Sequence, residues 1–325
     1  MTAQYKKIVS VTLKIVIVVL AFWFIYKKLL ANKDLRAFGG VLENKQQSEI
    51  AMVVGLVCLL MLFNWGLEAW KWKRLISPVE RISLWLAIES VFCGLTWAIF
   101  TPNRLGEYGG RVFFLSPKRR VAGIVAMTVG NMGQLVLTNV FGAVAACIFL
   151  YRFKSLDYHL FLAVCALGLA FCLFFLIFFF NIKWLKGLLL SMRWTRKYQK
   201  FYAVLGRYSK RELFKILAFC MARYLVFSIQ YYILFQWLIP DLYFSDIMVM
   251  VSLLFFVQSA LPSLDFLDVG IRSYTAAYLF GYITSNLIAV IAVTASIWLV
   301  NLIVPAILGS FFVFKLRFFG NYKRV

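Results

Sequence analysis

Residues 102–111 contain a proline, glycines, an acid and two arginines, which are residue types suited to binding an anion. Pro102 breaks a helix, and Gly106 lets the backbone turn or pack closely. Glu107 and Arg111 are four positions apart, so on a helix they share one face and can form an ion pair. Arg104 is a second cation just before them. The segment therefore predicts a break between two helices, followed by an arginine that is paired with an acid.

A second segment repeats these residue types. Pro262 is followed by Asp265 and Asp268, and Arg272 lies four positions beyond Asp268. Gly270 lies between that acid and the arginine. From proline to the paired acid the spacing is five residues in the first segment and six in the second. The prolines and glycines of both segments are expected to form the turns of two helical hairpins.

The chemistry predicted for these segments is the recognition of a lipid phosphate. A guanidinium fork matches phosphate geometry, and a charge inside an apolar helix is costly unless it has a partner or a function. We expect Arg111, Arg272 and Arg104 to bind the phosphate. The acids expected to orient or gate them are Glu107, Asp268, Asp265 and Glu89. In the alternative interpretation, each acid only neutralises its arginine and the hairpins lie in the membrane interface.

The elements that must position these residues are membrane helices. The chain is 63% hydrophobic and 15% charged, with a mean hydropathy of +0.84, whereas a soluble domain carries about 25% charged residues. Apolar runs predict six full spans at 8–30, 50–72, 121–150, 158–182, 212–238 and 284–314. The broken stretches 82–116 and 244–282 are predicted to be re-entrant hairpins.

The predicted fold is therefore an all-α, polytopic integral membrane bundle of about six full spans plus two opposed re-entrant helical hairpins. We expect one domain over residues 1–325, built as an inverted repeat of 49–150 and 212–315.

The distribution of Lys and Arg predicts the orientation. The net charge is +22, and the basic residues lie between apolar runs, which is typical of the positive-inside rule and not of a nucleic-acid-binding protein. The segment 183–211 is predicted to be a basic cytoplasmic loop, and both termini are predicted to be cytoplasmic. Lys71, Lys73, Arg74 and Arg81 are assigned to the same side. The segment 31–49 carries three cations on the opposite side and violates the rule.

The remaining residue types predict no metal, no cofactor and no catalytic group. The six cysteines contain no CxxC pair, and the chain has one histidine, so a Cys/His metal site is not expected. No nucleotide-binding loop or nucleophile elbow is present. These absences predict a protein that is not an enzyme.

The two segments together resemble the signatures of the lysylphosphatidylglycerol synthase transmembrane-region family, a flippase-like domain. The matching residues are Gly94 to Thr96, Pro102 to Glu107 and Arg111 in the first segment, and Ala260 to Pro262, Asp268 to Gly270 and Arg272 in the second. The resemblance covers about residues 10 to 315. Leu264, Asp265 and Phe266 replace a stretch that is usually rich in glycine. The family's aminoacyl-transferring domain is not expected here.

The resemblance implies lipid translocation across the bacterial cytoplasmic membrane. The expected cargo is an anionic phospholipid, an aminoacylated phospholipid or a polyprenyl-phosphate-linked lipid, with a separate lipid-modifying enzyme as a further partner. Two alternatives come from other classes. One is an integral membrane enzyme that modifies lipid headgroups, with Glu107 or Asp268 as general base. The other is a non-transporting membrane partner in envelope biosynthesis.

Overall fold

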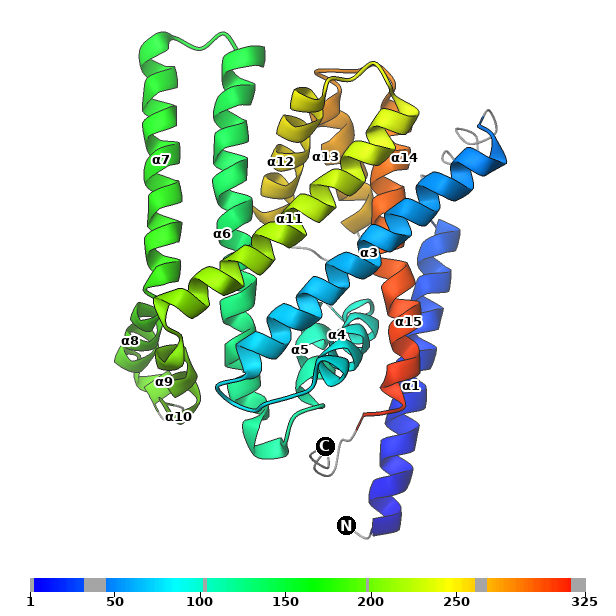
Figure 1. Ribbon diagram of the computed structural model, residues 1–325, viewed down its shortest axis with the longest axis vertical. Coiled ribbons are helices and arrows are strands. Elements are labelled where there is room, and N and C mark those ends of the chain that lie inside the picture. Colours follow the sequence, from blue (N-terminus) through cyan, green and yellow to red (C-terminus); the bar gives the residue numbers. More distant parts are fainter. Residues whose placement is uncertain (1–2, 32–44, 102–103, 197–198, 261–267, 317–325) are drawn as a thin grey trace.

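The computed structural model describes residues 3–31, 45–101, 104–196, 199–260 and 268–316, and these ranges contain helices and short connections but no strand. The long elements of the bundle appear in Figure 1. They are α1 (Ala3–Ala31), α3 (Gln47–Ile76), α6 (Arg120–Phe153), α7 (Tyr158–Phe180), α11 (Lys210–Leu238), and α14 (Leu287–Trp298), which continues through a π-helical turn, Leu299–Ile303, into α15 (Val304–Val313).

Five helical stretches in the described residues are long and apolar enough to cross a membrane, one fewer than the six predicted spans. They are Ile8–Lys27, Gln47–Ile76, Pro117–Phe153, Tyr158–Phe180 and Leu287–Val313. The predicted span 212–238 does form a continuous helix, α11, but α11 is not among the five. Its interior face carries polar side chains such as the buried Arg223 and Gln230, which lower its hydropathy while they contact protein.

Helix α7 is the element whose surface most favours a lipid environment. Its apolar side chains point outward in nearly every direction, and only Cys172 and Phe179 of this helix are buried. Leu167 and Phe174, for example, are well exposed. A helix that is apolar all round is stable in a hydrocarbon environment and not as a water-facing element.

Each of the two broken stretches forms two short helices. The first is α4 (Leu84–Ala98) with α5 (Leu105–Val112), and the second is α12 (Phe244–Ala260) with α13 (Asp268–Phe280). Ser83 caps α4 by accepting a hydrogen bond from the Leu86 backbone N–H. In Figure 1 the α4–α5 pair lies in the lower half of the bundle, whereas α12 and α13 lie in the upper half. The predicted turn prolines Pro102 and Pro262 lie outside the described residues.

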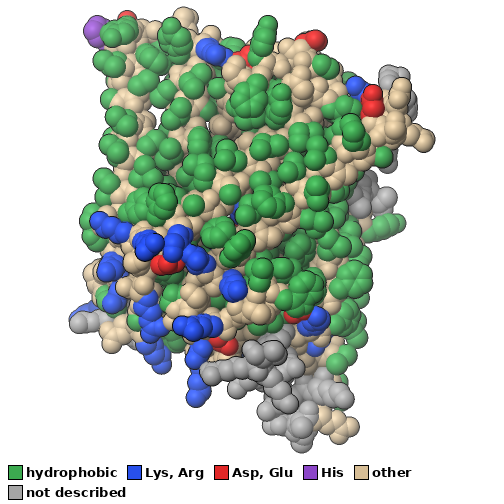
Figure 2. Space-filling view, in the orientation of Figure 1, with side chains coloured by type: hydrophobic (Ala, Val, Ile, Leu, Met, Phe, Trp, Pro, Cys, Tyr) green, Lys and Arg blue, Asp and Glu red, His purple; other side chains and the backbone are tan. Residues whose placement is uncertain are grey.

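The predicted loop 183–211 is mostly helical. The loop contains α8 (Lys183–Ser191), α9 (Arg193–Arg196), α10 (Gln199–Tyr202) and a 3₁₀ turn at Ala203–Arg207. Elsewhere in the chain, a short 3₁₀ turn at Pro117–Arg119 precedes α6. Helices α8 to α10 lie in the lower part of the molecule (Figure 1), and Figure 2 shows Lys and Arg side chains gathered at this end, with hydrophobic side chains above them. The exposed cations here are Lys183, Arg193, Lys200, Arg207, Lys210 and Arg211. Helix α1 begins and α15 ends at the same end of the view (Figure 1).

Candidate functional site

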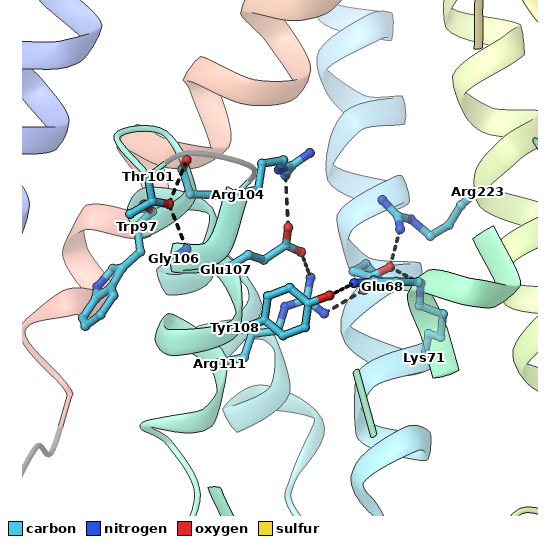
Figure 3. A network of polar contacts seen from close by, with 12 residues as sticks. Glu68, Lys71, Trp97, Thr101, Arg104, Gly106, Glu107, Tyr108, Arg111 and Arg223 are labelled. Carbon is cyan, nitrogen blue, oxygen red and sulfur yellow. Dashed lines mark hydrogen bonds and ion pairs between the residues drawn. The ribbon is translucent and has the colours of Figure 1, made fainter. Parts of the chain in front are cut away.

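A buried carboxylate on α3 organises the charges at the centre of the bundle. Glu68 is 3% exposed, and its two oxygens accept from three cations. Arg111 Nη1 lies 2.7 Å from Oε1 of Glu68, and Lys71 Nζ lies 2.7 Å from Oε2. Arg223 of α11 also donates to Oε2. Arg223 also donates through Nε to Asn64 Oδ1 at 2.8 Å. Figure 3 shows these side chains converging from α3, α5 and α11.

Helix α5 extends this network toward the open space between the helices. Glu107 accepts a hydrogen bond from Arg111, the residue four positions later, as the spacing predicts. Glu107 also lies 3.4 Å from Arg104, measured from Oε2 to Nη2. Arg111 therefore lies between two carboxylates, Glu68 and Glu107, and is itself only 2% exposed. Cations and acids alternate along this chain of contacts, which stabilises charges that would be costly to bury alone.

The start of α5 is held in place by backbone contacts that only certain residues permit. Thr101 donates its hydroxyl to the Trp97 carbonyl at 2.9 Å and accepts from the Gly106 N–H at 2.8 Å. A Cβ at Gly106 would lie 2.3 Å from that same Trp97 oxygen, so no larger residue fits. Arg104, just before α5, has a left-handed backbone with φ of 55°. Such a conformation is uncommon for arginine and is often found at functional sites.

The charged side chains border a cavity of about 420 Å³. Arg104 and Glu107 reach it from the first segment and Arg272 from the second. Arg272 also donates to Gln258 Oε1 at 3.2 Å. Glu68, Lys71 and Arg223 form the remaining charged part of its lining. The cavity size lies within the range of small-molecule sites in proteins, about 300–1,000 Å³.

The structure brings only some of the predicted site residues to this cavity. Arg104, Glu107 and Arg272 line the cavity, and Arg111 lies behind it between the two carboxylates. Glu89 of α4 lies elsewhere, where it pairs with Lys315. Gly106 lies in the first turn of α5. Pro102, Pro262 and Asp265 lie outside the described residues. Asp268 and Gly270 lie in the first turn of α13.

Glu68, Lys71 and Arg223 are the charged residues for which no role at this site is predicted from the sequence. Lys71 is assigned above to the cytoplasmic side, which stays a prediction; its side chain is 1% exposed and paired with Glu68. The spacing of Glu68 and Lys71, three positions apart near the end of an apolar helix, is the signal that could have identified them. Arg223, which pairs with Glu68, is on another helix, so no spacing rule connects it.

No group of three or more His, Cys, Asp or Glu side chains within the described ranges could hold a metal ion. The described charged residues that line the cavity are four cations and two carboxylates. A scan against protein-family models found no matching family, and a search of curated proteins found no match. The resemblance to the lysylphosphatidylglycerol synthase transmembrane region stays a prediction.

Proposed function

We propose that this chain is a lipid translocase of the cytoplasmic membrane, and that the central cavity holds the phosphate-bearing headgroup of its cargo. The observation that carries this proposal is the meeting of the two segments at one cavity. Arg104 comes from the first segment and Arg272 from the second, far apart in sequence, and both line the same space. Arginines that face a cavity inside an apolar bundle are functional residues by default.

The charge of the cavity supports an anionic ligand. Among the described lining residues there are four cations, Lys71, Arg104, Arg223 and Arg272, and two carboxylates, Glu68 and Glu107. A phosphate group would offset part of the excess of positive charge and accept several charge-assisted hydrogen bonds. Bilayer lipid is the abundant source of phosphate for a protein whose outer surface is this apolar.

Within this proposal the arginines have different roles. Arg104 and Arg272 are the contacts for phosphate, because both line the cavity. Arg111 is a positioning residue, because Glu68 and Glu107 already accept its hydrogen bonds. Glu107 holds Arg104 only through a contact of 3.4 Å, so an incoming phosphate could replace that contact without breaking a short ion pair.

The arrangement of the short helices supports a route for the headgroup. We interpret α4–α5 and α12–α13 as two re-entrant hairpins that enter from opposite faces, in line with their positions in Figure 1. Opposed hairpins of this kind line the central site of inverted-repeat transporters, where each face gates the site in turn. The basic end formed by α8–α10 is then the cytoplasmic face, by the positive-inside rule.

The proposal is tested by headgroup translocation in proteoliposomes. Acyl-labelled fluorescent phosphatidylglycerol is reconstituted with the protein, and a membrane-impermeant reductant reports the label on the outer leaflet. We expect wild-type protein to move the lipid, and Arg104→Gln and Arg272→Gln to slow it by roughly 10- to 100-fold. This range follows from the loss of a hydrogen bond to a charged group, about 1.5–3 kcal/mol.

Matched controls are Lys118→Gln and Lys183→Gln, which remove an exposed cation distant from the cavity. Both are expected to retain wild-type rates. Equal rates for the control and cavity variants would refute the assignment of the cavity. Mass spectrometry of the lipids after the incubation serves a second purpose. A chemically altered headgroup would favour a lipid-modifying enzyme over a translocase.

A further inference from the structure

The cavity also contains polar groups that the phosphate proposal does not use. Asn301 of the π-helical turn is 6% exposed and lines the cavity; its Nδ2 donates to the Ile297 carbonyl at 3.1 Å. Its Oδ1 is buried and has no donor among the described residues. Among the described residues, Gln134 Oε1 on α6 likewise has no donor and Gln258 Nε2 on α12 has no acceptor, and both side chains lie on the cavity wall. Buried polar atoms without partners are costly and point to a ligand that completes them.

These three atoms require both donors and acceptors from the ligand. The oxygens of Asn301 and Gln134 need donors, whereas the Gln258 nitrogen needs an acceptor. A hydroxyl group supplies both, since it donates one hydrogen and accepts on two lone pairs. An ammonium group only donates, so it cannot satisfy Gln258. The set of amides therefore fits a headgroup that carries several hydroxyls.

The charge balance points in the same direction. The described lining has four cations and two carboxylates, and one phosphate only partly offsets that excess. A cationic group attached to the phosphate would then lie close to like charges, which is unfavourable in a site of low dielectric. A neutral headgroup carries no such cost.

Aromatic side chains complete the lining. Trp65, Phe227, Phe255 and Trp298 border the cavity together with the amides. The C–H-rich face of a ring-shaped polyol packs favourably on the electron-rich face of an aromatic ring. Convergent amides among aromatic surfaces are the arrangement by which a pocket orients a ligand of this kind.

We infer that the cavity selects a phosphate lipid whose headgroup is a neutral ring polyol, a sugar or an inositol, over one that carries an aminoacyl ammonium. This inference rests on the proposed translocase function and narrows its cargo. The cations of the lining disfavour a positively charged headgroup; they are Lys71, Arg104, Arg223 and Arg272. The amides of Gln134, Gln258 and Asn301 form hydrogen bonds with the hydroxyl groups.

The inference is tested with a panel of acyl- or prenyl-labelled fluorescent lipids in the same proteoliposomes. The panel consists of a polyprenyl-phosphate hexose, phosphatidylinositol, lysyl-phosphatidylglycerol and phosphatidic acid. We expect the two polyol lipids to move at least about tenfold faster than the lysyl lipid. A higher rate for one of the two polyol lipids identifies the natural source of the headgroup. The paired variant Gln134→Leu/Asn301→Leu is expected to reduce the preference for polyol over phosphatidic acid by about tenfold. Gln47→Leu, an exposed amide on α3, is expected to leave it unchanged.

Two results would overturn the inference while leaving the translocase intact. One is a lysyl lipid that moves as fast as the polyol lipids, with all rates still lost in Arg272→Gln. The other is an unchanged polyol preference in the folded amide variant. If that variant does not fold, the wild-type panel alone decides. Failure of every lipid to move, or equal rates in Arg272→Gln and wild type, would instead overturn the proposed function itself.

Discussion

Glu68→Gln is expected to destabilise the protein more than any other single charge substitution in the described bundle. Glu68 is the common acceptor for Lys71, Arg111 and Arg223, all in the interior. Removing one member of a buried ion pair leaves its partner uncompensated and costs about 3–5 kcal/mol. Lys71 is affected most, because Arg111 keeps Glu107 and Arg223 keeps Asn64. Thermal unfolding in detergent, followed by intrinsic tryptophan fluorescence, measures the loss.

The matched control is Glu49→Gln, which neutralises an exposed acid on the same helix and is expected to change stability by less than about 0.5 kcal/mol. A second variant separates charge from shape. Lys71→Met in the Glu68→Gln background removes the uncompensated ammonium and is expected to recover part of the lost stability. An unfolding temperature of Glu68→Gln equal to that of the control would contradict the central role of this carboxylate.

Gly110→Ala is expected to displace α5 and to abolish translocation. A Cβ at Gly110 would lie 2.4 Å from the Gly94 Cα and 2.7 Å from the Gly94 N. Both are backbone atoms of α4, so no side chain can move aside. Close contact through small residues is a usual way for membrane helices to pack. Overpacking of this kind costs about 1–3 kcal/mol, and it moves Glu107 and Arg111 away from Glu68. Unfolding temperature and phosphatidylglycerol translocation are the two measurements.

Gly66→Ala provides the comparison, because nothing lies within 4 Å of a Cβ at that position on α3. Alanine favours a helix over glycine by about 1 kcal/mol, so this variant is expected to be as stable as the wild type or more so, with normal translocation. If Gly110→Ala behaved like Gly66→Ala, then α4 and α5 could not pack as closely as described, and the position of Arg111 beside Glu68 would lose its support.

Prediction from sequence succeeded where interactions are local. Glu107 and Arg111 pair because four positions on a helix bring side chains to one face. The two broken stretches each form two short helices, as the proline and glycine in their sequences predict. Boundaries of the apolar helices also follow from their runs of hydrophobic residues. The predicted span 212–238 forms the helix α11 but is not among the five apolar stretches of membrane length, because α11 buries polar groups against neighbours and hydropathy alone does not distinguish these from exposed ones.

The charged site could be predicted only in part. Arg111 stands out in the sequence as a phosphate ligand, yet its side chain is held by two carboxylates, while Arg104 reaches the cavity. From the sequence, Lys71 is interpreted as one of the cations that follow a membrane helix, because its neighbours Lys73 and Arg74 are also basic. Its burial depends on which face of α3 meets α6 and α11, and a single helix does not contain that information.

By itself, the sequence determined that this is an all-helical chain with membrane-length apolar helices, because hydrophobicity and helical hydrogen bonding are set by residues within a turn or two of each other. Only the tertiary structure decided which charges meet. Glu68, Arg111 and Arg223 lie on α3, α5 and α11 and become partners through the packing of those helices. Buried charges select partners in three dimensions, since the low dielectric makes an unpaired one costly wherever it lies in the chain.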